Sequence, residues 1–145
     1  MNFSMKKLSE EFQNRVPFYT TQKAGELIRA GKIKALKENV DRASDFVEIS
    51  SVVSSQRNYD HYDVFILIDG NTSKIEDTHC ECLDYKSNIT SSNKYICKHI
   101  AAALSKYISL RIAKNKDSKN IKPKTIKLPV TIPSEAPITI KYGEK

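Results

Sequence analysis

No run of this chain is apolar enough to cross a bilayer, so we do not expect a membrane-spanning protein. Residues 1–20 contain lysines but no apolar stretch behind them, so they predict no secretory signal peptide. The 145 residues are 39% hydrophobic with a mean hydropathy of −0.49, which suits one domain with a modest core, or one domain with an arm. We therefore expect a cytoplasmic protein whose thiols stay reduced.

The chain also lacks a phosphate-binding loop of the Gly-x-x-x-x-Gly-Lys-Ser/Thr type. Its nearest approach, Gly31-Lys32, is followed by Ile33 rather than by a hydroxyl residue. The adjacent acids Glu76 and Asp77 could indicate acid–base chemistry, but a solvated strand end explains them more simply. We therefore predict that this chain contains no ATPase motor and no catalytic constellation, and that it is not an enzyme.

Cysteine is scarce, and all three cysteines fall in one short stretch. Cys80 and Cys82 form a Cys-x-Cys pair, and Cys97 and His99 form a Cys-x-His pair after residues 83–96. The odd count and the closeness of the first two thiols argue against disulfides. Three thiolates and one imidazole suit tetrahedral zinc. We predict one structural Zn²⁺ on these four side chains, with no position left for a catalytic water.

Other interpretations stay open when the residues are considered alone. The cysteines could be small buried core residues, or they could form a redox site. His79 immediately precedes Cys80 and could replace His99 as the fourth ligand, although His99 has the better spacing to Cys97. His61 lies between polar and aromatic residues and is expected on the surface or in a turn.

The Cys-x-Cys pair, the spacer and the sequence CKHIAAAL at residues 97–104 together resemble the SWIM zinc finger, whose pattern is Cys-x-Cys-x(n)-Cys-x-His. The resemblance implies the same ligands, Cys80, Cys82, Cys97 and His99. Two features depart from the family. Leu83 stands where many members have proline, and residues 93–96 lack the glycine that often precedes the third cysteine. These departures affect the shape of the loop and leave the ligand set intact.

The SWIM family occurs in bacterial helicase-like ATPases of the Swi/Snf type, in Mutator-type transposases and in some kinase-linked ubiquitin ligases. The sequence AGELIRAGKIK at residues 24–34 resembles the stretch before the finger in the bacterial ATPases, and residues 121–145 faintly resemble the β-rich segment after it. The resemblance implies the N-terminal part of such an ATPase, or a stand-alone relic of one. It also implies a bacterial cytoplasmic location, at the nucleoid if the protein binds DNA.

Hydrophobic periodicity predicts an α+β fold, in which a small antiparallel sheet carries N-terminal helices and a zinc-anchored helix. Ser4 is expected to cap a helix over residues 4–15. Thr20 or Thr21 is expected to cap a second helix, which Gly31 ends in the left-handed conformation. Strands are expected over residues 32–36, 46–53, 62–68 and 73–78, with 62–68 central because both of its faces are apolar.

After the last strand, a polar loop is expected over residues 84–93 and the zinc-anchored helix over residues 97–112. We divide the chain into a zinc-binding domain over residues 1–112 with its finger core at 78–104, a basic linker over 113–124, and the start of a β-rich segment over 125–145.

The charge of +7 is unevenly distributed. Residues 1–40 have eight basic and four acidic side chains, residues 41–90 have four and ten, and residues 91–145 have twelve and three. A lysine-rich tail can be a solvated arm, but it can also mark a nucleic-acid interface. The first hypothesis is a module that binds nucleic acid, which we expect to be DNA bound without sequence specificity, or that contacts a linked ATPase motor. The expected phosphate contacts are Lys94, Lys98, Lys106, Arg111 and Lys114.

Tyr95 is the residue expected to stack on a base in that interface. The alternative is a zinc-stabilised protein–protein interaction module that does not bind nucleic acid, in which the acidic sheet or an apolar edge docks a protein partner.

Overall fold

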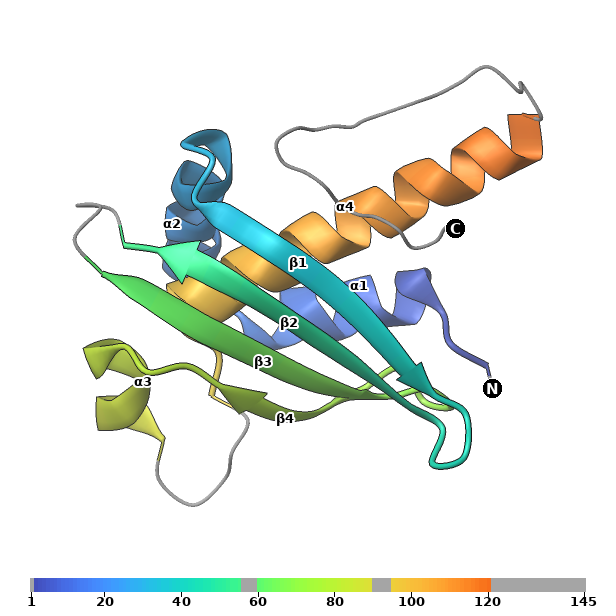
Figure 1. The fold of residues 1–145 in the computed structure, drawn as a ribbon, viewed down its shortest axis with the longest axis horizontal. Helices are drawn as coiled ribbons and strands as arrows, with labels where there is room; N and C mark the ends of the chain where they lie inside the picture. The colour runs from blue at the N-terminus through green and yellow to red at the C-terminus, as the bar shows by residue number, and fades with distance from the viewer. Residues whose placement is uncertain (1, 56–59, 90–94, 121–145) are drawn as a thin grey trace.

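A computed structural model describes residues 2–55, 60–89 and 95–120, and the statements below concern these residues. The chain forms an α+β fold, as the sequence predicted. In chain order the elements are α1 (Met5–Arg15), α2 (Phe18–Arg29), β1 (Ile33–Asp41), β2 (Phe46–Ser54), β3 (His61–Asp69), β4 (Ile75–His79), α3 (Leu83–Asn88) and α4 (Lys98–Asn120). The strands form one sheet in the order β1-β2-β3-β4, and each neighbouring pair is antiparallel (Figure 1).

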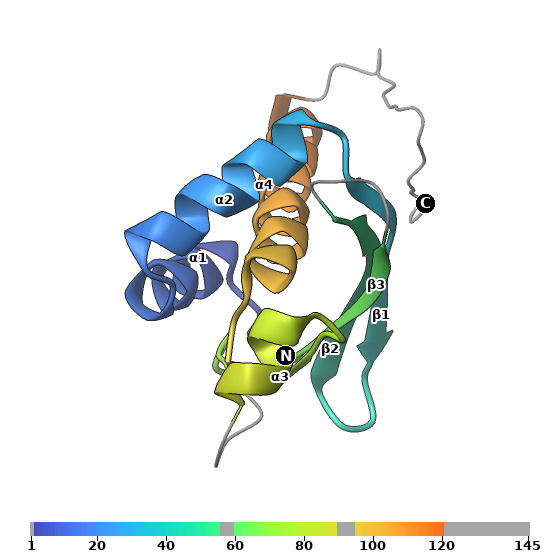
Figure 2. The ribbon, with the colours of Figure 1, turned by 90° about the vertical axis from the view of Figure 1, so that its left-hand side faces the viewer.

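Helix α4 lies between the α1–α2 pair and the sheet (Figure 2). Its buried residues from Ile100 to Leu104 include three alanines, which let it approach α2 and the strands closely. β2 and β3 turn alternate side chains, such as Ile49 and Ile66, toward this helix. Because α4 begins at the cysteine cluster, the same helix joins that cluster to the core.

The helix ends follow the sequence expectation in part. The Ser4 Oγ accepts a hydrogen bond from the Lys7 N–H at 3.2 Å and so caps α1. Gly31 has a φ of 71° just after α2, as expected for a left-handed residue that ends a helix. The expectation for the start of α2 was wrong, because this helix begins at Phe18, directly after Pro17, and Thr20 and Thr21 lie inside it.

β1 continues to Asp41, well past the expected end at residue 36. Ala35 has a φ of 53°, and the pairing with β2 shifts between Lys34 and Lys37, so a bulge interrupts the alternation of apolar and polar residues. Beyond the bulge Glu38 occupies a position on the helix-facing side, opposite the buried Ile49. The bulge and the inward carboxylate together hide this strand from a search for alternating apolar residues.

Two other elements differ from the expected boundaries. Residues 83–88, expected to be part of a polar loop, form the short helix α3. α4 runs to Asn120, through residues expected to begin a linker, and its sequence between 98 and 120 contains neither proline nor glycine to end it. The expected β-rich segment over residues 125–145 lies outside the described residues, and so does most of the expected loop beyond residue 89.

Among the described residues, no helix is both long enough and apolar enough to cross a bilayer.

Candidate metal centre

The four predicted ligands come from the ends of three elements. Cys80 directly follows β4, and the backbone leaves the strand there, so that Cys82 can turn back toward the same point. Cys82 is the residue that caps α3. Cys97 directly precedes α4, where its carbonyl accepts the Ala101 N–H at 2.9 Å, and His99 lies in the first turn of this helix. The strand end and two helix starts thus converge on one place.

The structure brings Cys80, Cys82, Cys97 and His99 into one buried cluster, with their ligand atoms all within 4.8 Å of one another. The His99 Nδ1 lies 4.0 Å from the Cys80 Sγ and 3.9 Å from the Cys97 Sγ. These separations are close to those between donors that share a tetrahedral ion with bonds of about 2.0–2.3 Å. None of the four side chains is more than 3% exposed.

The electrostatics of the cluster centre on Cys82. Hydrogen bonds from the Cys80 and Cys97 thiols hold the pKa of Cys82 well below its ordinary value, although burial opposes this. The Tyr85 N–H, in the first turn of α3, adds a hydrogen bond to the Cys82 Sγ at 3.3 Å. Hydrogen bonding to Cys82 raises the pKa of Cys80 to about 12. Hydrogen bonding to Cys80 and Cys82 raises the pKa of Cys97 well above its ordinary value, and burial contributes to both shifts. Among the three cysteines, Cys82 is thus the one whose surroundings most favour the thiolate.

The donor set fits zinc. Three thiolates and one imidazole satisfy the tetrahedral coordination of Zn²⁺ completely, and metal binding would release the protons that the thiols hold. The buried Cys₃His cluster is therefore consistent with one structural zinc ion. All four coordination positions are filled by protein atoms, as in structural rather than catalytic zinc sites.

His99 is held in place by its ring contact and by burial. Its ring packs at a tilt on Tyr62 of β3, with 4.8 Å between the ring centroids. Its Nδ1 faces the sulfur atoms, and its Nε2 is buried without a hydrogen-bond partner among the described residues. The Nδ1 is therefore the nitrogen that faces the proposed ion.

The residues around the cluster tie its three elements together. The Tyr85 hydroxyl of α3 donates to the Thr78 carbonyl of β4, and the Thr78 Oγ1 donates to the Tyr95 carbonyl at 2.7 Å. The Tyr95 hydroxyl donates to Asp84 at 3.2 Å, and its ring lies 6.1 Å from the ring of Tyr85. This network positions the segment before α4 and hence Cys97. The network also involves both the carbonyl and the hydroxyl of Tyr95, the residue that the sequence predicts to stack on a base.

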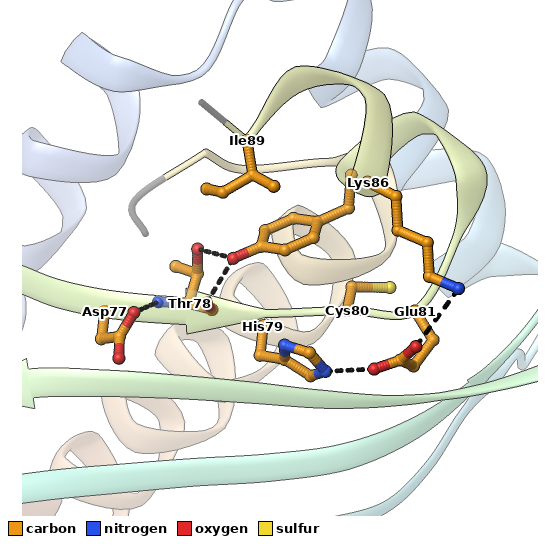
Figure 3. A pocket seen from close by; sticks show the side chains of 8 residues that line it. Asp77, Thr78, His79, Cys80, Glu81, Lys86 and Ile89 are labelled. Carbon is orange, nitrogen blue, oxygen red and sulfur yellow. Dashed lines mark hydrogen bonds and ion pairs between the residues drawn. The ribbon is translucent and has the colours of Figure 1, made fainter. Parts of the chain in front are cut away.

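His79, the alternative fourth ligand, lies outside the cluster. It is about half exposed, and its Nε2 pairs with the Glu81 carboxylate, which also pairs with Lys86 at 3.3 Å. These two contacts lower the pKa of Glu81, the His79 contact being the larger cause. The three side chains line a hollow of about 290 Å³ beside the cluster (Figure 3). Their charges are already paired within the chain.

The structure describes four of the five predicted phosphate contacts, all of them on α4. Lys94 lies outside the described residues. The Arg111 guanidinium donates to the Glu38 carboxylate and to the Tyr107 hydroxyl, so its charge is engaged on β1. Lys114 lines the same small cavity as Arg111. Lys98, Lys106 and Lys114 follow one another at intervals of eight residues, so each lies about a quarter turn from the next at 100° per residue, and Lys98 and Lys106 are half-buried.

Comparison with known proteins identifies part of this architecture. Residues 62–108, from β3 into α4, match the family model of the SWIM zinc finger. No curated protein and no solved structure matches the chain. The chain thus contains a SWIM zinc-finger segment with a Cys-x-Cys…Cys-x-His cluster, and the match does not extend to a helicase-like context.

Proposed function

We propose that this zinc-binding SWIM module binds nucleic acid through the basic surface of its helices, and that zinc serves to hold the fold together. The binding would be to phosphate groups, without sequence specificity. The observation that carries the proposal is the separation of charge between the helices and the sheet.

The helices are basic and most of the sheet is acidic. Up to Lys114, helices α1, α2 and α4 have three carboxylates and nine basic side chains, namely Lys6, Lys7, Arg15, Lys23, Arg29, Lys98, Lys106, Arg111 and Lys114. Strands β2, β3 and β4 contain no lysine or arginine and five carboxylates, namely Glu48, Asp63, Asp69, Glu76 and Asp77. A polyanion would therefore approach from the helical side.

The proposed interface lies mainly on α1 and α2 rather than on α4. Much of α4 is covered by α1, α2 and the sheet, whereas Lys6 and Lys7 on α1 and Arg29 on α2 are exposed. The exposed aromatic rings of Phe18 and Tyr19 at the start of α2 could add stacking contacts with bases. Arg111 is excluded from the proposed contacts because Glu38 already neutralises it.

We further propose that the chain acts by binding and is not itself an enzyme. The proposed metal would have four protein ligands and no open position, and beside it Glu81 is in contact with both His79 and Lys86. A helicase-like ATPase, as implied by the sequence resemblance, would supply the motor for which this module provides an accessory contact.

The test is a binding titration with the zinc-loaded full chain. Fluorescence anisotropy would follow a labelled DNA duplex, and a single strand of the same sequence, over a series of salt concentrations. We expect the logarithm of the association constant to fall linearly with the logarithm of the salt concentration, with a slope of several. The double variant Lys6→Glu/Lys7→Glu should weaken binding on the order of tenfold at low salt.

The matched control is Lys34→Glu/Lys37→Glu, which changes the charge equally on β1, opposite β2 positions that face away from the helices. This variant should bind DNA nearly as the unchanged chain does. An absence of binding at low salt, or equal losses in the two variants, would contradict the proposal.

The second candidate is a protein-interaction module that does not bind nucleic acid. The observation that favours it is the face of the sheet that no described helix covers, where apolar side chains lie among carboxylates. The DNA titration separates the two candidates.

A further inference from the structure

One face of the sheet is covered by helices, and the other face is not covered by any described helix (Figure 2). The buried residues of β2 and β3, such as Ile49 and Ile66, point toward α4. The residues between them point the opposite way. We call this second side the outer sheet face. On β2 and β3 it comprises Phe46, Glu48, Ser50, Val52, Asp63, Phe65, Leu67 and Asp69.

The outer sheet face has an apolar stripe where polar residues would be expected. In an antiparallel sheet with one solvated face, the outward positions are usually polar. Here the register places Phe65 diagonally beside Val52, and Leu67 diagonally beside Phe46, while Phe65 and Leu67 are neighbours on β3. All four side chains are half-buried in the chain by itself. The stripe therefore runs without interruption across β2 and β3.

Carboxylates border this stripe on most sides, whereas Lys34 on β1 lies opposite Val52 and His79 on β4 lies opposite Phe65. Asp63 lies opposite Val52, and Glu48 lies opposite Leu67. The outer strands add Asp77, opposite Leu67 on β4, and Asp41, opposite Phe46 on β1. The lysines of this face, Lys34 and Lys37, both lie on β1. An apolar stripe bordered by negative charge complements a segment with apolar residues on one side and basic residues beside them.

We propose that the outer sheet face docks an amphipathic helix of a partner protein, with leucine-like side chains on the stripe and lysine or arginine side chains against the carboxylates. A helix is the element that commonly covers the free face of a sheet in layered folds. From Phe46 to Val52 the stripe is about 20 Å long at 3.3 Å per residue, which matches about 13 residues of helix. The proposed nucleic-acid surface lies on the other side of the sheet, so both partners could bind together.

The probe is a synthetic helical peptide of about 14 residues with leucines along one face and lysines beside them. Fluorescence anisotropy would measure its binding to the zinc-loaded full chain. Leu67→Thr, which keeps a residue suited to a strand, and Glu48→Lys should each weaken binding about tenfold. Leu110→Gln and Glu10→Lys make similar changes to exposed residues of α4 and α1, and should leave binding within about twofold.

A peptide with glutamates in place of the lysines should not bind. Circular dichroism and zinc content would confirm that each variant is folded. An absence of binding to the full chain, or equal losses in Glu48→Lys and Glu10→Lys, would overturn the proposal. Self-association of the chain that Leu67→Thr abolishes would also overturn it, because a second copy would then be the occupant of this face.

Discussion

His99 is the residue that closes the cluster, because it supplies the single nitrogen beside three sulfur atoms. Its Nδ1 lies within 4.0 Å of two of those atoms, whereas the imidazole of His79 is paired with Glu81 at the surface. The two histidines are thus close in the sequence, but they lie in different surroundings. The structure favours His99 as the zinc ligand on this ground.

The first prediction compares the two histidines by substitution. His99→Ala should lose bound zinc, because three donors leave one coordination position without a protein ligand. His99→Cys should retain zinc, since four thiolates are also a common structural set. His79→Ala is the matched control and should keep about one zinc per chain, because it removes only an exposed pair with Glu81, which contributes little to stability. Elemental analysis of protein purified without chelator would measure the metal, and zinc loss in His79→Ala alone would reverse the assignment.

At the scale of single residues, spacing predicted which side chains come together but not how they are supported. The pairs Cys80/Cys82 and Cys97/His99 stand out because their residue types are rare in the chain and lie close together. The capping role of Cys82 could not be read from the sequence, because helix caps are usually recognised as Ser, Thr, Asp or Asn. The short helix α3 was missed for this reason.

Single elements can be tested through their ends, and α1 offers the clearest case. Ser4→Ala should lower the free energy of unfolding by about 1 kcal/mol, because the Lys7 N–H loses its acceptor. Ser9→Ala lies inside the same helix and should cost nothing, since alanine is the better helix former. Chemical denaturation of the zinc-loaded proteins would measure both values. Equal losses would show that the Ser4 hydroxyl does not act as a cap.

α4 is tied to β1 through a polar contact that also makes stability depend on pH. The Tyr107 hydroxyl donates to the Glu38 carboxylate. Burial, together with the Glu38 charge, raises the pKa of Tyr107. The folded protein therefore keeps this proton at a pH where the unfolded chain loses it. The resulting stability is fully present below the ordinary phenol pKa of about 10 and is lost as the pH rises toward the folded value.

We therefore expect the free energy of unfolding to fall above about pH 10, and to fall less steeply in Tyr107→Phe. At neutral pH the free energy of unfolding of this variant should be lower by about 0.5–1.5 kcal/mol, because the hydrogen bond to Glu38 is lost. Tyr19→Phe removes an exposed phenol and serves as the control. Urea titrations at several alkaline pH values would measure the slopes. Parallel curves for Tyr107→Phe and the unchanged chain would contradict the assignment.

The elements were predictable where local pattern and tertiary environment agree. β2 and β3 alternate inward apolar residues and were located nearly to their ends. The length of β1 was not predicted, because its inward Glu38 accepts hydrogen bonds from Tyr107 and Arg111, more than sixty residues later in the chain. No local pattern contains such a partner. The end of α4 differs for another reason. The polar composition after residue 112 predicts a linker, but it contains neither proline nor glycine up to Asn120, where the helix ends.

At the scale of the whole molecule, the metal cluster and the hydrophobic core are continuous. Cys80, Cys82 and Cys97 belong to the same buried cluster as Leu8 of α1 and Leu27 of α2. α4 begins at the metal centre and then passes between α1, α2 and the sheet. A loss of metal at one end of α4 should therefore affect how the helix packs along its length. The N-terminal helices and the sheet should survive as a looser unit.

The last prediction follows from this continuity. Removing zinc with a chelator should lower the unfolding temperature and reduce the cooperativity of unfolding, because structural zinc contributes on the order of 10–16 kcal/mol of apparent binding free energy in small fingers. Helical circular dichroism should fall as α4 loosens, while part of the sheet signal remains. Adding zinc in excess should restore both signals, which separates metal loss from irreversible damage. Cys97→Ser should show the chelated behaviour without chelator. If the metal-free chain unfolds at the same temperature and as cooperatively as the zinc-loaded chain, then the core alone supports the fold, and the cysteines are buried core residues.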